Sequence, residues 1–244
     1  MLSITNLVVL GGAFGGGFIS GLVGFGTGLM ALAIWLYVLA PSAASSLVAV
    51  CSVLSQVQTI PLIWHAIDRR RIWPMLAAGL LGVPVGTRLL SFIDPITFHL
   101  AMGGLLIGFS SFMLFGRRET RLLWGGQAAD SAIGFLGGLL GGLAGLSGPF
   151  PTMWSALRGW SKDERRGVIQ TFNLTILSAS LLSHAAAGLL TRDFGRLVLL
   201  ALPGTVGGSW LGIYAYRRLS DHHFHRIVLG VLGLSGLTLL WSSL

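Results

Sequence analysis

The first 67 residues contain no Asp, Glu, Lys or Arg, and the first such residue in the chain is Asp68. At about 1.5 Å rise per residue, a helix of this length would be roughly three times longer than the ~30 Å hydrocarbon core of a bilayer. Over all 244 residues, 53% are hydrophobic and 10% are charged, and the mean hydropathy is +0.80. These values are typical of polytopic membrane proteins. We therefore expect an all-α chain that enters the membrane several times.

Charged and turn residues divide the chain into eight apolar segments. They are 4–38, 45–66, 72–92, 98–115, 128–157, 167–190, 197–216 and 225–244. Six of them are close to the ~20 residues that one spanning helix needs. A continuous helix over the first or the fifth segment would be much longer than the bilayer core, so we expect each of these to be broken or re-entrant.

The fifth segment contains GFLGGLLGGLAGLSGPFP, Gly134–Pro151, which is rich in the two poorest helix formers. Irregular backbone at membrane depth is tolerated only where it is buried in protein or lines a wet cavity. A break also exposes helix N-termini, whose free N–H groups and positive dipole ends attract anions. We predict binding sites at two breaks, Gly24–Gly28 and Gly145–Pro149.

The two long segments are related in sequence. A shift of 121 residues places Phe14, Gly16, Gly17, Gly21, Leu22 and Gly24 on Phe135, Gly137, Gly138, Gly142, Leu143 and Gly145. A shift of 126 residues pairs Gly82 and Gly86 with Gly208 and Gly212, at a spacing that favours close helix packing. We therefore predict two repeats of four segments each, residues 1–116 and 117–244, with the first segment of each repeat broken or re-entrant.

The basic residues predict how the repeats are oriented. If all eight segments simply span, the 16 Lys and Arg divide evenly between the two faces. If the first and fifth segments return to the side they entered, only Arg88, Arg192 and Arg196 lie on one face, and all others lie on the opposite face. The positive-inside rule then places the basic face in the cytoplasm and both termini in the periplasm, and the repeats are inverted.

The polar residues of the apolar segments are neutral. Seven of the eight acidic residues lie in predicted loops, and we expect the eighth, Asp130, to cap the start of the fifth segment. Gln56 lies one turn beyond Ser52, and Gln170 and Asn173 share a helix face. The predicted substrate-binding residues are Gly26, Thr27, Gly28, Ser52, Gln56, Ser147, Gly148, Pro149, Gln170 and Asn173. These donors favour a small anion, and we expect no catalytic residue, metal or cofactor; the single cysteine, Cys51, excludes a cysteine cluster.

The doubled pattern GGGFISGLVGFGTG and GFLGGLLGGLAGLSGPFP, with DERRGVIQTFN after the second copy, resembles the TauE/SafE family of sulfite exporters, which are small permeases of the bacterial inner membrane. The resemblance covers nearly the whole chain and implies export of sulfite, thiosulfate or organosulfonates by a multi-pass protein. Thr27 replaces a glycine of the family's usual first break. The expected partners are the anion and membrane lipid, and the sequence leaves open whether two copies form a homodimer.

Three other functions compete with export. A passive anion channel of the same fold would have the same sequence features. A rhomboid-like intramembrane protease would use Ser147 in Gly145-Leu146-Ser147-Gly148 as nucleophile with His184 as base, but the repeat places Gly26 at the nucleophile's position. His184 is more simply a hydrogen-bonded core residue. The sequence pI near 11.2 suggests nucleic acid, but the basic residues are scattered over short loops, so we expect no such partner.

Overall fold

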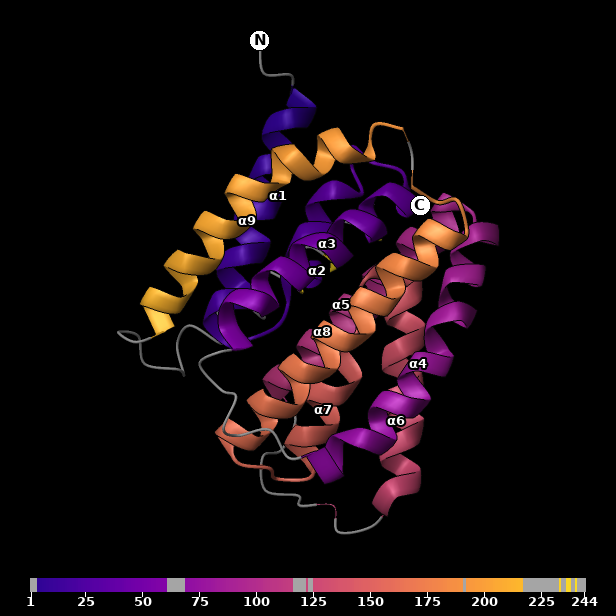
Figure 1. Cartoon of the computed structure of the whole chain (residues 1–244), viewed down its shortest axis with the longest axis vertical. Helices are drawn as coiled ribbons and strands as arrows, with labels where there is room; N and C mark the ends of the chain where they lie inside the picture. Colours follow the sequence, from indigo (N-terminus) through magenta and orange to yellow (C-terminus); the bar gives the residue numbers. More distant parts are fainter. Residues whose placement is uncertain are drawn as a thin grey trace.

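The computed structural model of the chain describes residues 4–60, 69–115, 122, 125–190, 192–216, 233, 236, 237 and 240. This part of the chain forms helices and contains no strand (Figure 1). The helices are α1 (Ile4–Val23), α2 (Thr27–Trp35), α3 (Pro41–Thr59), α4 (Arg69–Phe92), α5 (Pro95–Phe115), α6 (Gly126–Ala144), α7 (Pro149–Leu157), α8 (Lys162–Ala186) and α9 (Phe194–Tyr216). The predicted all-α class is confirmed for these residues.

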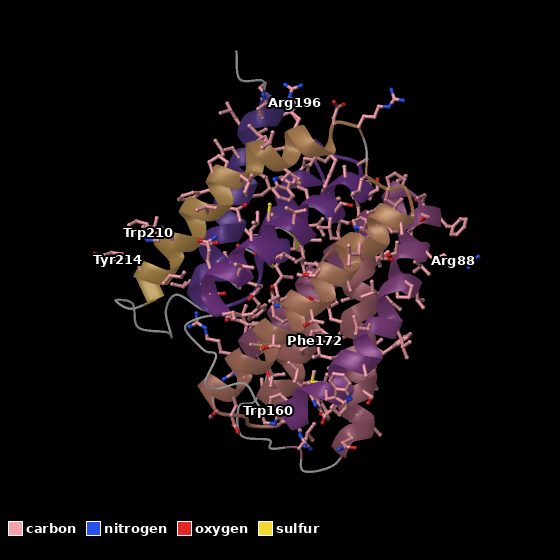
Figure 2. All side chains as sticks on the ribbon, in the orientation of Figure 1. Arg88, Trp160, Phe172, Arg196, Trp210 and Tyr214 are labelled. Carbon is pink, nitrogen blue, oxygen red and sulfur yellow. The ribbon has the colours of Figure 1, made fainter. Side chains whose placement is uncertain are left out.

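Among the helices of the described residues, four are long and apolar enough to cross a membrane, namely α1, α4, α5 and α9. The outer surface is correspondingly apolar. Trp210 on α9 is 68% exposed and stacks on Tyr214, and both side chains point away from the bundle (Figure 2). Phe172, in contrast, is completely buried. Exposed aromatic side chains on an apolar helix are expected of a protein whose solvent is lipid.

Most helices begin before the apolar segments predicted from the sequence. Pro41 and Pro95 start α3 and α5, because proline has a helical φ and lacks an N–H that the first turn could not satisfy. The first turn of α8 is polar and is stabilised by a capping box between Ser161 and Glu164. The end of the predicted segment 45–66 and nearly all of the predicted segment 225–244 lie outside the described residues.

Each of the two long apolar segments contains two helices. Between α1 and α2, Gly26 has a φ of +102°, and it precedes α2 without a side-chain cap. Between α6 and α7, Gly145 ends α6 with a φ of +68°, and Pro149 starts α7. Left-handed backbone is inexpensive only for glycine, and proline cannot continue a preceding helix, so these residues explain both interruptions.

Glycines bring two pairs of helices into close contact. In α1 and α9, a Cβ on Gly21 would overlap the Ser209 carbonyl, and one on Gly212 would overlap the Phe18 carbonyl. The contact between α6 and α4 follows the same pattern, with Gly142 against the Val83 carbonyl and Gly86 against the Leu139 carbonyl. Residue numbers rise together along each pair, so the paired helices are parallel. These positions exclude larger side chains because the neighbouring backbone occupies the space.

Tryptophans attach the two short helices to the long helices before them. Trp35 of α2 donates a hydrogen bond from Nε1 to the Val9 carbonyl of α1, at 3.1 Å. Trp154 of α7 donates from Nε1 to Oδ1 of Asp130 in α6, at 2.7 Å. Val9 and Asp130 are related by the same shift of 121 residues that relates the glycines. In both interrupted segments, a tryptophan of the short helix therefore hydrogen-bonds to the same relative position of the long helix.

The prediction that Asp130 caps the fifth segment is wrong. α6 begins at Gly126, four residues earlier, and Asp130 is a buried residue within the helix. Its carboxylate accepts the hydrogen bond from Trp154 instead. Along α6, Asp130 is about 20 Å from Gly145 at 1.5 Å per residue, so this acidic side chain lies far from the second interruption.

Candidate anion site between the helix interruptions

α3 and α8 contact each other in the interior, and the two helix interruptions lie against them. A small cavity is enclosed where these four elements meet. It is lined by Phe25, Gly26, Thr27, Gly28, Leu29, Ser52, Gln56, Gly145, Leu146, Ser147, Gly148, Pro149, Asn173 and Leu177. The structure therefore brings together every predicted site residue except Gln170.

The two interruptions are in direct contact. A Cβ on Gly28 would lie 2.7 Å from the Val48 side chain and 3.2 Å from the carbonyl oxygen of Gly145, and it would also press on Leu146. A Cβ on Gly145 would in turn lie 2.9 Å from the Ser45 carbonyl oxygen. The glycines thus allow the start of α2 to approach the end of α6 at van der Waals distance.

Two helix N-termini meet at this cavity. The first residues of α2 line it, as does Pro149 at the start of α7, and neither helix has a side-chain cap. The first-turn N–H groups of a helix have no intrahelical acceptor, and they carry the positive end of the dipole. Pro149 and Pro151 have no N–H, so α7 offers fewer amide donors than α2.

Ser147 and Asn173 connect the second interruption to α8. The Ser147 hydroxyl donates a hydrogen bond to Oδ1 of Asn173 at 2.7 Å. A Cβ on Gly148 would lie 3.5 Å from Nδ2 of Asn173 and 3.0 Å from the Phe25 ring. Because Oδ1 is engaged, Nδ2 is the donor that Asn173 can offer to a ligand.

On the opposite wall, Gln56 and Thr27 differ in their hydrogen bonding. Gln56 donates from Nε2 to the Gly24 carbonyl at 3.1 Å, which fixes its amide. The Thr27 side chain is 1% exposed, and its hydroxyl has no partner among the described residues. This hydroxyl, at the position where the sequence departs from the resembling family, is therefore available to a ligand.

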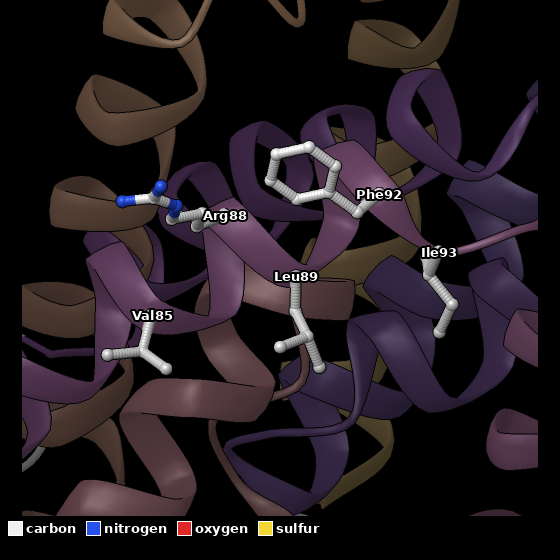
Figure 3. Close-up of a pocket in the computed structure, with 5 residues that line it drawn as sticks. All are labelled: Val85, Arg88, Leu89, Phe92 and Ile93. Atoms are coloured by element: carbon white, nitrogen blue, oxygen red, sulfur yellow. The ribbon is translucent and has the colours of Figure 1, made fainter.

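The cavity has a volume of about 20 Å³, which is room for about one water molecule. A much larger groove of about 490 Å³ lies on α4 and shares no residue with it (Figure 3). Apart from Arg88, the groove is lined by exposed or half-buried apolar side chains, among them Leu89 and Phe92. Its apolar lining suits lipid, whereas the small cavity has the polar donors.

Gln170 lies outside the cavity, although it was predicted to share it with Asn173. Its side chain is completely buried, and neither amide atom has a hydrogen-bond partner in the described part of the chain. Conversely, the apolar lining residues are not among the predicted substrate-binding residues, although Phe25 and Leu146 lie within the two predicted breaks. Phe25 packs edge-on against Phe109 of α5, and Leu177 lies one turn beyond Asn173. In an apolar sequence these residues have no feature that separates them from core residues.

His184 has the environment of a core residue. It is completely buried, and its Nε2 donates to the Gly142 carbonyl at 2.6 Å. Nδ1 therefore accepts from the Ser46 hydroxyl at 2.9 Å. Ser147 and His184 thus have different hydrogen-bond partners, and no Ser–His pair of the kind a protease dyad needs is present between them.

The sequence profile of the family described as sulfite exporter TauE/SafE matches residues 8–239 of the chain. This match covers nearly the whole sequence and confirms the resemblance inferred from the two glycine-rich motifs. No curated protein and no solved structure matches the chain.

Proposed function

Since the chain belongs to the TauE/SafE family of sulfite exporters, we propose that it exports small sulfur oxyanions through the cavity between the two helix interruptions. The candidate substrates are sulfite, thiosulfate and organosulfonates. The observation that carries this proposal is the meeting of two uncapped helix N-termini, those of α2 and α7, at one cavity. Such ends bind anions through free N–H groups and the positive end of the helix dipole.

The chemistry of the lining supports an anion over a cation. Among the described residues, the polar side chains of the cavity are hydroxyls and amides, and no Asp or Glu lines it. Carriers of cations usually keep an ionisable acid inside the membrane. The Thr27 hydroxyl has no acceptor among the described residues, and Asn173 has an amide donor, Nδ2, next to its engaged Oδ1. Both donors suit a ligand whose oxygens only accept hydrogen bonds.

The small volume supports a transport cycle with an occluded form. A space of about 20 Å³ is too small for a sulfur oxyanion with its three or more oxygens. The cavity must therefore widen before it binds substrate, and it must open to each side in turn. The interruptions are suitable hinges, because glycine accommodates large changes in backbone angles.

We further propose that the two interrupted segments belong to inverted repeats, with both termini in the periplasm of a bacterial inner-membrane protein. The matched contacts of α1 with α9 and of α6 with α4 support a two-fold relationship. α1 and α6 begin at opposite ends of the molecule (Figure 1). Arg196 and Trp160 also lie at opposite ends (Figure 2), as the orientation predicted from the basic residues requires.

Counterflow in proteoliposomes tests the proposal. Vesicles preloaded with unlabelled sulfite should accumulate labelled sulfite transiently, and the rate should saturate with concentration. Asn173→Ala should reduce the rate, whereas Thr175→Ala, on the same helix but outside the cavity, should not. Flux without counterflow or saturation would identify a passive channel instead. The absence of any flux of sulfite, thiosulfate or a short sulfonate would reject the proposed substrate class.

A further inference from the structure

Gln170 is a buried polar group that the cavity does not explain. Its side chain is 0% exposed, and both its amide nitrogen and its amide oxygen lack a partner among the described residues. Burying an amide without hydrogen bonds is costly, and unmet groups of this kind in native structures call for a water or a ligand. The neighbours of Gln170 indicate whether a water or a ligand would satisfy its amide.

Gly24, the first residue after α1, separates Gln170 from the cavity. Its φ is +89°, and the space that a Cβ would fill is occupied by Nε2 of Gln170. Nε of Arg166 lies 3.2 Å from the same point. The Gly24 carbonyl meanwhile accepts the hydrogen bond from Gln56, which lines the cavity. A guanidinium and an unmet amide therefore meet on one side of this turn, and the cavity lies on the other.

The same residues are aligned along one face of α8. Arg166, Gln170 and Asn173 are spaced by four and three residues, which places their side chains in a row. At 1.5 Å per residue, Gln170 is about 4.5 Å and Arg166 about 10 Å along the axis from Asn173. The row leads from the cavity to the polar first turn of α8, whose helix dipole is positive.

We propose that Gln170 and Arg166 form a second anion-binding position, through which small sulfur oxyanions pass between the cavity and the end of the molecule where α8 begins. Arg166 supplies the positive charge, and Gln170 supplies an amide donor at the point where the anion leaves water. Glycine at position 24 leaves room for the Gln170 amide, because the Cβ of any other residue would overlap Nε2 of Gln170. This inference rests on the proposed function, since it adds a step of access to the same site.

Cysteine labelling tests the position without requiring transport. Gln170→Cys is made in a Cys51→Ala background, which removes the only native thiol. We compare an anionic reagent, sulfonatoethyl methanethiosulfonate, with its cationic trimethylammonium analogue, each added from one side of the membrane at a time. The anionic reagent should react on the order of 10-fold faster, as expected for electrostatic attraction in a confined path. Sulfite should slow this reaction.

Matched variants show whether the reagent reacts at position 170 because an anion binds there or only because the cysteine is accessible. Adding Arg166→Gln should remove the preference for the anionic reagent, whereas Arg165→Gln, one residue away, should preserve it. Ser180→Cys, a completely buried position further along α8 whose native hydroxyl donates to the Ile176 carbonyl, should not react. Equal rates for the two reagents, no effect of Arg166→Gln, or no labelling at Gln170→Cys would each overturn the proposal.

A second measurement uses Gln170→Leu, which removes the unmet amide and should fold because it leaves no new polar group buried. Its counterflow rate should fall by on the order of 10-fold, while sulfite affinity stays within about 2-fold. Wild-type counterflow in both Gln170→Leu and Arg166→Gln would reject the position and leave the proposed function intact. Anion-selective labelling of Gln170→Cys, together with a wild-type protein that moves no sulfite, would instead reject the proposed function.

Discussion

The Ser147 hydroxyl donates a hydrogen bond to Oδ1 of Asn173 at 2.7 Å. This bond joins the second helix interruption to α8 and sets the orientation of the Asn173 amide. Nδ2 then remains as a donor beside Gly148. The two residues act as one unit, in which Asn173 contacts the anion and Ser147 positions Asn173.

Substitution of this pair should weaken binding unequally. Asn173→Ala should reduce sulfite affinity by roughly 1–3 kcal/mol, the value of one hydrogen bond to a charged group. Ser147→Ala should cost less, because Asn173 keeps its donor and loses only its orientation. Isothermal titration of the purified protein in detergent measures both, with Thr175→Ala as the control.

The double variant gives a sharper result. If the residues act as a unit, Ser147→Ala should add little to Asn173→Ala, whereas independent contributions would add. Unchanged affinity in Asn173→Ala would contradict the site. Complete loss of function in Ser147→Ala alone would instead indicate that Ser147 is a nucleophile, as in the protease alternative.

Gly148 should be the glycine whose enlargement affects the ligand most directly. A Cβ there would lie 3.0 Å from the Phe25 ring and in van der Waals contact with the Asn173 amide, 3.5 Å from Nδ2. Gly148→Ala should therefore reduce counterflow while the protein remains folded in the membrane. Gly104→Ala on α5 is the control, since nothing lies within 4 Å of its Cβ position.

Gly28→Ala should behave differently from Gly148→Ala. Its Cβ would collide with Leu146 and Val48, so it should destabilise the contact between the interruptions by roughly 1–3 kcal/mol, as overpacking does. Size-exclusion profiles and melting temperatures separate the two effects. An equal loss of folded protein in both variants would show that Gly148 serves packing alone.

Most of the cavity could be predicted from the sequence, because glycine and proline mark the interruptions locally and neutral polar residues stand out in apolar helices. Gln170, a predicted substrate-binding residue, lies outside the cavity lining. It does share a helix face with Asn173, but the turn at Gly24, distant in sequence, lies between it and the cavity. Sequence periodicity gives the face of a helix and does not give what packs against it.

The hydrogen-bond partner of Asp130 could not be predicted from its local position in the sequence either. Its place at the start of an apolar segment suggested a cap, yet its partner is Trp154, 24 residues further along the chain. The apolar lining residues Leu29 and Leu177, which lie outside the two predicted breaks, were missed for a related reason. These residues line the cavity only because of where the tertiary structure places them. Their side chains are chemically the same as those of the core.

The glycine contacts predict matched losses of stability in the two helix pairs. Gly86→Ala in α4 and Gly212→Ala in α9 would each place a methyl group on a backbone carbonyl of the paired helix. Each should lower the free energy of unfolding by roughly 1–3 kcal/mol. Gly207→Ala, on α9 with nothing within 4 Å, should have no such effect. Thermal unfolding in detergent measures the three variants, and a stable Gly212→Ala protein would argue against the two-fold relationship.

The membrane orientation can be measured independently of transport. If the interrupted segments return to the side they enter, reporter fusions within Met1–Asn6 and after Leu244 should both report the periplasm. A fusion in the loop near Trp160 should report the cytoplasm. A cytoplasmic C-terminus would contradict the inverted-repeat proposal, because the basic residues would then divide evenly between the two faces.

The pH dependence of binding should be that of the ligand. The cavity is lined by hydroxyl, amide and apolar groups, none of which titrates near neutral pH. Sulfite affinity should therefore fall as acid adds a proton to the anion and removes charge, since hydrogen bonds to charged groups are the stronger ones. A short sulfonate keeps its charge over the same range, and its affinity should stay constant. Titrations of both anions across pH, on the wild-type protein and on Asn173→Ala, separate the ligand's protonation from that of the protein. If sulfonate affinity also changed with pH, a protein group would have to be coupled to the site, and His184, bonded to the Gly142 carbonyl near the end of α6, would be the first residue to replace.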